Sequence, residues 1–213
     1  MKNACLVCGE DLRFFEEARE MECVFCHTKH MSNASCENGH YVCDECHGKQ
    51  SVVQIRKTAL ETGSKDPFEI AVTMMRDPYV HLHGNENPNL VGSALLAAYH
   101  NAGGQIDLNK ALEEMHSRGK QVPGGVCGFW GACGAAISAG IFVSIITGST
   151  PLSRKEWGQS NLMTAKALGD IGAVGGPRCC KRNAFLSIGA AVEFCRQEFG
   201  IRMETSDVFC GFS

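Results

Sequence analysis

Residues 23–46 read CVFCHTKHMSNASCENGHYVCDEC, and this stretch sets the fold of the N-terminal part of the chain. Together with an earlier Cys-x-x-Cys, it supplies four closely spaced ligand pairs: Cys5 and Cys8, Cys23 and Cys26, Cys36 and His40, Cys43 and Cys46. Each such turn directs two ligand atoms to one metal ion, so four pairs predict two tetrahedral zinc sites. Because fifty residues bury little apolar surface, zinc is expected to supply the folding free energy of residues 1–50.

The order of the pairs does not show which two pairs bind the same zinc ion. In an interleaved arrangement, Cys5, Cys8, Cys36 and His40 share one ion, and Cys23, Cys26, Cys43 and Cys46 share the other. In a sequential arrangement, pairs that are neighbours in the sequence share an ion. Residues 23–46, with Gly39-His40 and Cys43-Asp44-Glu45-Cys46, resemble the middle of RING or treble-clef modules, but the final ligand pair of those families is missing. Cys5 and Cys8 can replace that pair from the other side, which favours the interleaved arrangement. The module is expected to be structural, and it could also dock a protein partner. Ubiquitin ligation is not expected.

The charge and the cysteine content of the chain argue against some classes of function and favour others. The net charge of −3 argues against broad electrostatic binding to nucleic acid or anionic membranes. The thirteen cysteines are the unusual feature. Because residues 1–5 lack an apolar signal region, the cysteines favour metal ligation over disulfides and predict a cytoplasmic protein.

A charge-free segment, residues 121–153, is long enough to imitate a membrane span. It is rich in Gly, Ala, Ser and Cys, and its apolar part, residues 132–147, is short. We therefore expect residues 132–147 to form a buried central helix, with no membrane insertion.

Residues 51–213 carry the start and stop signals of helices. The expected starts are Asp66-Pro67, Asn87-Pro88, Asp107, and Ser153 with Glu156 as a capping box. No alternating run is long enough to predict a sheet there. The chain is therefore predicted to be mainly α, with an all-helical domain (residues 51–213) preceded by a small RING/treble-clef-like zinc module (residues 1–50).

Three loop segments before expected helices carry residues suited to chemistry. They are HLHGNEN at 81–87, CGFWGACG at 127–134 and GGPRCCKRN at 175–183. A helix N-terminus presents free backbone N–H groups and the positive end of the helix dipole. These loops therefore suit an anion, such as a thiolate-bound iron–sulfur cluster or a carboxylate.

Two of these segments carry a family resemblance. Residues 131–134 (GACG) resemble the Gly-Ser-Cys-Gly segment of bacterial iron–sulfur L-serine dehydratases, and residues 179–184 (CCKRNA) resemble their Cys-Ile-Lys-Arg-Asn-Ala segment. The related L-cysteine desulfidases share the helical, cluster-binding design. In those families three cysteines hold a [4Fe–4S] cluster whose fourth iron is open to substrate.

The resemblance implies that Cys133 and Cys179 are two of the three cluster ligands. The family's middle cysteine would fall near Asp170, where this chain has none, so Cys127 or Cys180 would have to be the third. More extensively, the chain resembles an uncharacterised cysteine-rich domain family with a His-Gly-x-Glu segment before a Leu-Leu-x-Ala-Tyr helix. Some of its members occur beside methyltransferases, and it implies no activity.

The enzyme hypothesis is an iron–sulfur-dependent, lyase-like or sulfur-handling protein acting on a small amino-acid-like substrate. His81 or His83 would carry protons, with Glu86 in the same loop. Arg178, Lys181 or Arg182, with Asn183, would hold a substrate carboxylate. The alternative is a non-catalytic metal- or cluster-binding protein for storage, transfer or sensing. A third possibility is a metal-free redox pair formed by Cys179 and Cys180.

Overall fold

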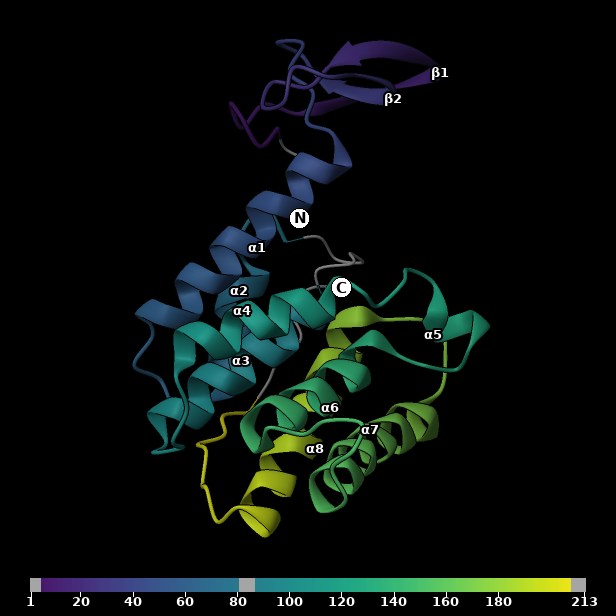
Figure 1. The fold of residues 1–213 in the computed structure, drawn as a ribbon. Coiled ribbons are helices and arrows are strands. Elements are labelled where there is room, and N and C mark those ends of the chain that lie inside the picture. Colours follow the sequence, from purple (N-terminus) through teal and green to yellow (C-terminus); the bar gives the residue numbers. More distant parts are fainter. Residues whose placement is uncertain (1–4, 81–86, 208–213) are drawn as a thin grey trace. The chain divides into compact units, whose positions relative to one another are not determined.

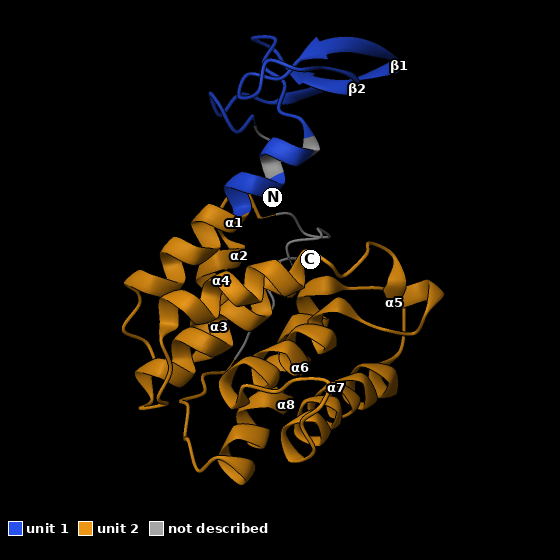
Figure 2. Cartoon of the chain, in the orientation of Figure 1, with its two compact units in different colours: residues 1–51 blue, residues 52–213 orange. Residues whose placement is uncertain are grey.

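The computed structural model describes residues 5–80 and 87–207, which divide into two compact units (Figure 2). The N-terminal unit comprises residues 1–51 and the helical unit residues 52–213. Helix α1 (Asp44–Glu61) begins in the first and ends in the second.

The N-terminal unit contains a two-stranded antiparallel sheet (Figure 1). Strand β1 (Leu12–Glu22) pairs with β2 (Lys29–Cys36), from Leu12 opposite Cys36 to Glu22 opposite Lys29. The register shifts between Phe14 and Arg19. Most residues of β1 are exposed, and β2 alternates between exposed and half-buried positions before the buried Ser35 and Cys36, so the backbone ladder and the flanking cysteines, rather than an apolar face, define the hairpin. The chain is thus helix-rich but not wholly helical.

The helical unit contains no strand among its described residues. Its further helices are α2 (Pro67–Met75), α3 (Asn87–Asn101), α4 (Leu108–Gly119), α5 (Val126–Phe129), α6 (Gly134–Thr147), α7 (Lys155–Val174) and α8 (Cys180–Glu198). This confirms the mainly helical character that the start and stop signals predict.

The core of this unit is built around α6, which packs against α3, α4, α7 and α8 (Figure 1). Phe142 is fully buried and meets Tyr99 edge to face, with ring centroids 5.7 Å apart. A Cβ added at Gly140 would lie only 3.1 Å from the backbone oxygen of Ser160, so α6 and α7 approach closely because this residue is glycine. The predicted buried helix is confirmed, and no helix among the described residues has the length and apolarity to cross a membrane.

Side-chain capping follows the sequence at two helix starts and departs from it at a third. Asp66 accepts hydrogen bonds from the backbone N–H groups of Phe68 and Glu69, and Asp107 accepts one from Lys110. The Ser153 capping box does not form. The Ser153 hydroxyl accepts from the backbone N–H of Thr150 at 3.0 Å instead, and α7 begins two residues later without a side-chain cap.

Candidate metal centres

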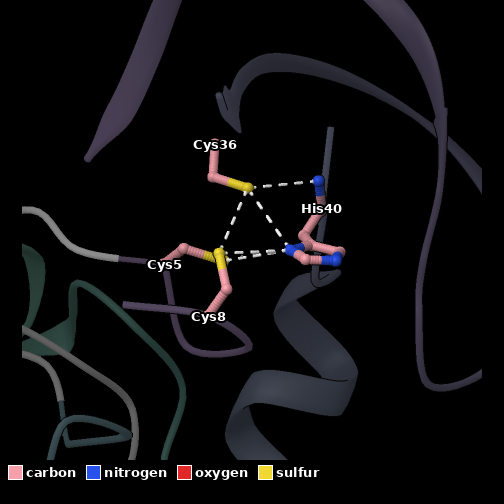
Figure 3. A group of neighbouring side chains, drawn as sticks. All are labelled: Cys5, Cys8, Cys36 and His40. Carbon is pink, nitrogen blue, oxygen red and sulfur yellow. Dashed lines mark hydrogen bonds between the residues drawn. The ribbon is translucent and has the colours of Figure 1, made fainter. Parts of the chain in front are cut away.

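The first ligand set, site 1, consists of Cys5, Cys8, Cys36 and His40, whose ligand atoms all lie within 4.8 Å of one another (Figure 3). His40 Nδ1 is 3.3 Å from Cys8 Sγ and 3.4 Å from Cys36 Sγ. The sulfurs of Cys8 and Cys36 are 3.8 Å apart. A tetrahedral zinc ion with Zn–S bonds of about 2.3 Å places its sulfurs about 3.8 Å apart, so this spacing fits one such ion.

Local backbone geometry aims the ligands of site 1. The N–H of Gly9 donates to the carbonyl of Cys5 at 2.8 Å, and Gly9 has the left-handed φ of 78° that a tight turn needs. The N–H of Val7 points at Cys5 Sγ, and that of His40 points at Cys36 Sγ, at 3.4 and 3.3 Å. These N–H groups help to fix the directions of the two sulfurs.

The second ligand set, site 2, consists of Cys23, Cys26, Cys43 and Cys46, again within 4.8 Å of one another. Cys26 and Cys43 place their sulfurs 3.8 Å apart, and the N–H of Cys43 donates to Cys23 Sγ at 3.4 Å. Cys23 and Cys43 are almost fully buried. Site 2 joins the turn after β1 to the start of α1, whereas site 1 joins the segment before β1 to the end of β2.

The grouping of the eight residues is therefore the interleaved one, and the pairs are not combined in sequential order. Both sets are four-ligand sites of the kind that can hold a metal ion such as zinc.

The thiols of these sites do not ionise equally in the absence of a metal. Hydrogen bonding from the backbone of Glu10, and from His40 and Asn38, lowers the pKa of Cys8 to about 6. Burial, reinforced by side-chain hydrogen bonds with the other cysteines of site 2, raises the pKa of Cys46 to about 12. A bound divalent cation would favour the thiolate form of all the cysteines that ligate it, because it stabilises several thiolates at once.

A third group of cysteines lies in the helical unit, around a pocket of about 70 Å³. Cys127 of α5, the α6 N-cap Cys133 and the first α8 residue Cys180 all line it, and we call it the cysteine pocket. Among the described residues these cysteines do not form a set as close as sites 1 and 2. Cys179 is not among the lining residues described, and its sulfur instead accepts the N–H of Arg182 at 3.5 Å.

The surroundings of Cys180 disfavour the thiolate form of this pocket residue. Burial raises the pKa of the Cys180 thiol, and the positive charge of Arg178 opposes that shift. Negative charge on Cys133, Cys127 or Cys179 would raise it further.

The predicted substrate-binding residues Arg178, Lys181 and Arg182 lie in different surroundings. Arg178 is exposed and lines the cysteine pocket, whereas Lys181 is fully buried. Arg182 donates from Nη2 to the carbonyls of Gly175 and Pro177, at 2.7 and 3.2 Å, and so holds the α7–α8 loop.

Asn183 also lines the pocket, and it donates to Cys133 Sγ at 3.4 Å. The predicted proton carriers His81, His83 and Glu86 lie outside the described residues. Sequence reasoning missed the pocket wall formed by Val122–Val126, although its Pro-Gly-Gly turn just before Cys127 was a usable signal.

The chain belongs to DUF5714, a family of unknown function, which matches residues 55–213. The matched region contains the cysteine pocket and excludes sites 1 and 2. No curated protein matches the chain, and no solved structure matches it. Family membership therefore assigns no activity to the pocket.

Proposed function

We propose that this chain is a metalloprotein with two kinds of centre. Two zinc ions hold the N-terminal unit together, and the helical unit carries a [4Fe–4S] cluster that serves lyase-like or sulfur-handling chemistry on a small amino-acid-like substrate. The observation that carries the proposal is that Cys127, Cys133 and Cys180 line one pocket at the starts of α6 and α8.

The donor set of the cysteine pocket suits a cluster better than a single ion. A lone zinc ion needs ligand atoms as close as those of sites 1 and 2. A cluster bound by thiolates has several irons, each with its own cysteine, so its ligands lie farther apart. Cys133 precedes α6 and Cys180 opens α8, where free N–H groups and the helix dipoles favour bound anions.

The geometry favours Cys180 over its neighbour Cys179 as the ligand from the CCKRNA segment. Cys180 lines the pocket, whereas the Cys179 sulfur accepts the N–H of Arg182 as a helix cap. This arrangement supports the set Cys127, Cys133 and Cys180.

The surrounding residues suit binding of a small anion. When bound, the cluster would supply a Lewis acid at an iron left open by three cysteines. Arg178 is the cationic side chain of the described wall, and it would pair with a substrate carboxylate. Gly124, Gly125 and Gly134 leave the wall without side chains at those points, so substrate can approach the backbone.

A non-catalytic role in storing, transferring or sensing a cluster is the second candidate. The described lining residues include no His, Asp or Glu, so apart from the cysteines assigned to the cluster they offer no proton carrier. The enzyme hypothesis therefore needs a base from residues 81–86, which directly precede the segment containing the lining residue Pro88. His81→Ala and His83→Ala variants that keep both the cluster and full turnover would favour the second candidate or another base.

Anaerobic reconstitution tests the cluster directly. We expect about four irons and four sulfides per chain, with the Mössbauer spectrum of a [4Fe–4S] cluster. Cys133→Ser and Cys180→Ser should lose most of the iron, whereas the matched control Cys179→Ser should retain it, because serine is a good N-cap. Zinc-only protein after reconstitution would disprove the cluster, and equal iron loss in all three variants would disprove the ligand assignment.

A further inference from the structure

Asn183 holds a specific position against one of the pocket sulfurs. Its side chain is only 5 % exposed, and its amide Nδ2 donates to Cys133 Sγ at 3.4 Å. Asn183 lies in the first turn of α8 and Cys133 at the N-cap of α6, so the hydrogen bond connects two helix starts that are far apart in the sequence.

The orientation of the Asn183 amide is fixed from its other side. Arg182 Nε donates to Asn183 Oδ1 at 3.3 Å, and a carbonyl oxygen is the end of an amide that can accept this bond. The Nδ2 group is thereby turned toward sulfur. Arg182 is itself held by the carbonyls of Gly175 and Pro177. A chain of hydrogen bonds thus runs from the α7–α8 loop to Cys133.

We infer that Asn183 is a positioning residue that donates an N–H···S hydrogen bond to the Cys133 thiolate and raises the reduction potential of the cluster. The inference rests on the proposed function. A reduced cluster carries more negative charge on its sulfurs than an oxidised one, so a donor to sulfur stabilises the reduced state more. The same contact orients Cys133 toward the pocket. Asn183 therefore acts on the ligand and not on the substrate, which leaves Arg178 to bind substrate.

Redox titration of the reconstituted full-length protein, followed by electron paramagnetic resonance, tests this role. Asn183→Leu keeps nearly the same size but has no donor, so its potential should shift to a more negative value while iron content is retained. Asn183→Asp should shift it further in the same direction, because an ionised carboxylate donates no hydrogen bond and adds negative charge. The matched control is Asn161→Leu, which changes an exposed asparagine that bonds within α7 to the carbonyl of Trp157. Its potential should equal that of the wild type.

The outcomes separate this inference from the proposed function. A wild-type protein that binds no cluster removes the proposed function, and the inference with it. A wild-type protein with a cluster, but with an unchanged potential in Asn183→Leu, overturns only the inference. The same holds if the variant weakens substrate binding without moving the potential, because Asn183 would then be a substrate contact. If Asn183→Leu loses its iron, the reduction potential of Asn183→Asp tests the inference instead. Loss of iron from both variants would overturn the inference, because Asn183 would then be needed to assemble the cluster and not to set its potential.

Discussion

The cysteines of the two units are arranged in different ways. In the N-terminal unit they form two sets whose ligand atoms lie within 4.8 Å of one another, and each set is built from two short turns. In the helical unit, three cysteines (Cys127, Cys133 and Cys180) lie around one pocket, and Cys133 and Cys180 stand at the starts of separate helices. Close pairs suit a single ion, whereas the described cysteines of the helical unit do not form a set that close.

The two units also differ in what holds them together. The buried cluster of the N-terminal unit consists of Cys23, Cys43 and Cys46, with Tyr41 and Val42 packed against it. The helical unit instead buries a large apolar core that includes Phe142. We therefore expect metal removal to unfold the first unit and to leave the second folded.

The largest expected effect follows from removing one ligand of site 2. Cys43→Ala should abolish metal binding at site 2, reduce the zinc content of the full chain from about two to about one, and unfold residues around that site. A structural zinc contributes on the order of 10 kcal/mol in zinc-finger peptides, which a core this small cannot replace. Elemental analysis and NMR spectra of the full chain check both results.

The control for this variant is His27→Asn. His27 is exposed, lies outside both ligand sets and has a φ of 56°, a conformation that asparagine tolerates. It should keep full zinc content. A well-dispersed NMR spectrum for the N-terminal unit of zinc-free wild type would show that the metal is not required, and the contrast between the units would disappear.

A second expected effect is a strong pH dependence of zinc affinity. Burial raises the pKa values of Cys5 and Cys43, and burial raises the pKa of Cys46 to about 12, so these thiols carry protons at pH 7 in the metal-free unit. Zinc binds thiolates, so binding releases these protons and affinity rises with pH, by about tenfold per pH unit for each proton released.

The slope of this dependence should steepen below pH 6. There Cys8 and Cys23, whose pKa values are lowered to about 6, also take up protons that zinc must displace. Competition titrations with a zinc chelator at pH values on both sides of this point measure the slope. An affinity that does not change with pH would contradict these protonation states.

The sequence predicts best those features of the fold and the sites that depend on residues close together in the chain. The ligand pairs of sites 1 and 2 and the caps at Asp66 and Asp107 are set by residues within a few positions of one another, so they can be found by spacing alone. The β1–β2 hairpin is not predicted by the sequence, because β1 buries no regular face and the half-buried positions of β2 (His30, Ser32 and Ala34) give no apolar alternation.

The cysteine pocket shows where such reasoning stops. The sequence indicates that Cys179 and Cys180 open a helix, but it cannot show which of the two sulfurs faces α6. That choice depends on the rotation of α8 about its axis, which is set by core packing along the whole helix. For the same reason, the burial of Lys181 and the contact of Asn183 with Cys133 could not be read from the motif.

A smaller effect than zinc loss is expected from damage to the core of the helical unit. Phe142→Ala removes a fully buried ring that contacts Tyr99, which should lower the free energy of unfolding of this unit by about 3–5 kcal/mol. Zinc content should not change, since sites 1 and 2 belong to the other unit. Denaturant unfolding followed by helical circular dichroism, with zinc analysis of the same sample, checks both points. Concurrent loss of zinc would show that the two units do not fold independently.

The smallest effect is expected from Cys133→Ser, and it gives the sharpest contrast with Cys43→Ala. Cys133 is only partly buried, and as the α6 N-cap its side chain makes no capping hydrogen bond. Serine is among the preferred N-cap residues, so its hydroxyl can accept a backbone N–H that the thiol leaves without a side-chain partner. The loss of the Asn183 N–H···S contact opposes this gain, so the free energy of unfolding of the metal-free helical unit should stay within about 1 kcal/mol of the wild-type value.

Differential scanning calorimetry of iron-free protein, with zinc present, measures this change. Collapse of the helical unit in this variant would mean that its thiols hold the fold together as those of the N-terminal unit do, and that the cysteine pocket is a structural site and not a functional one.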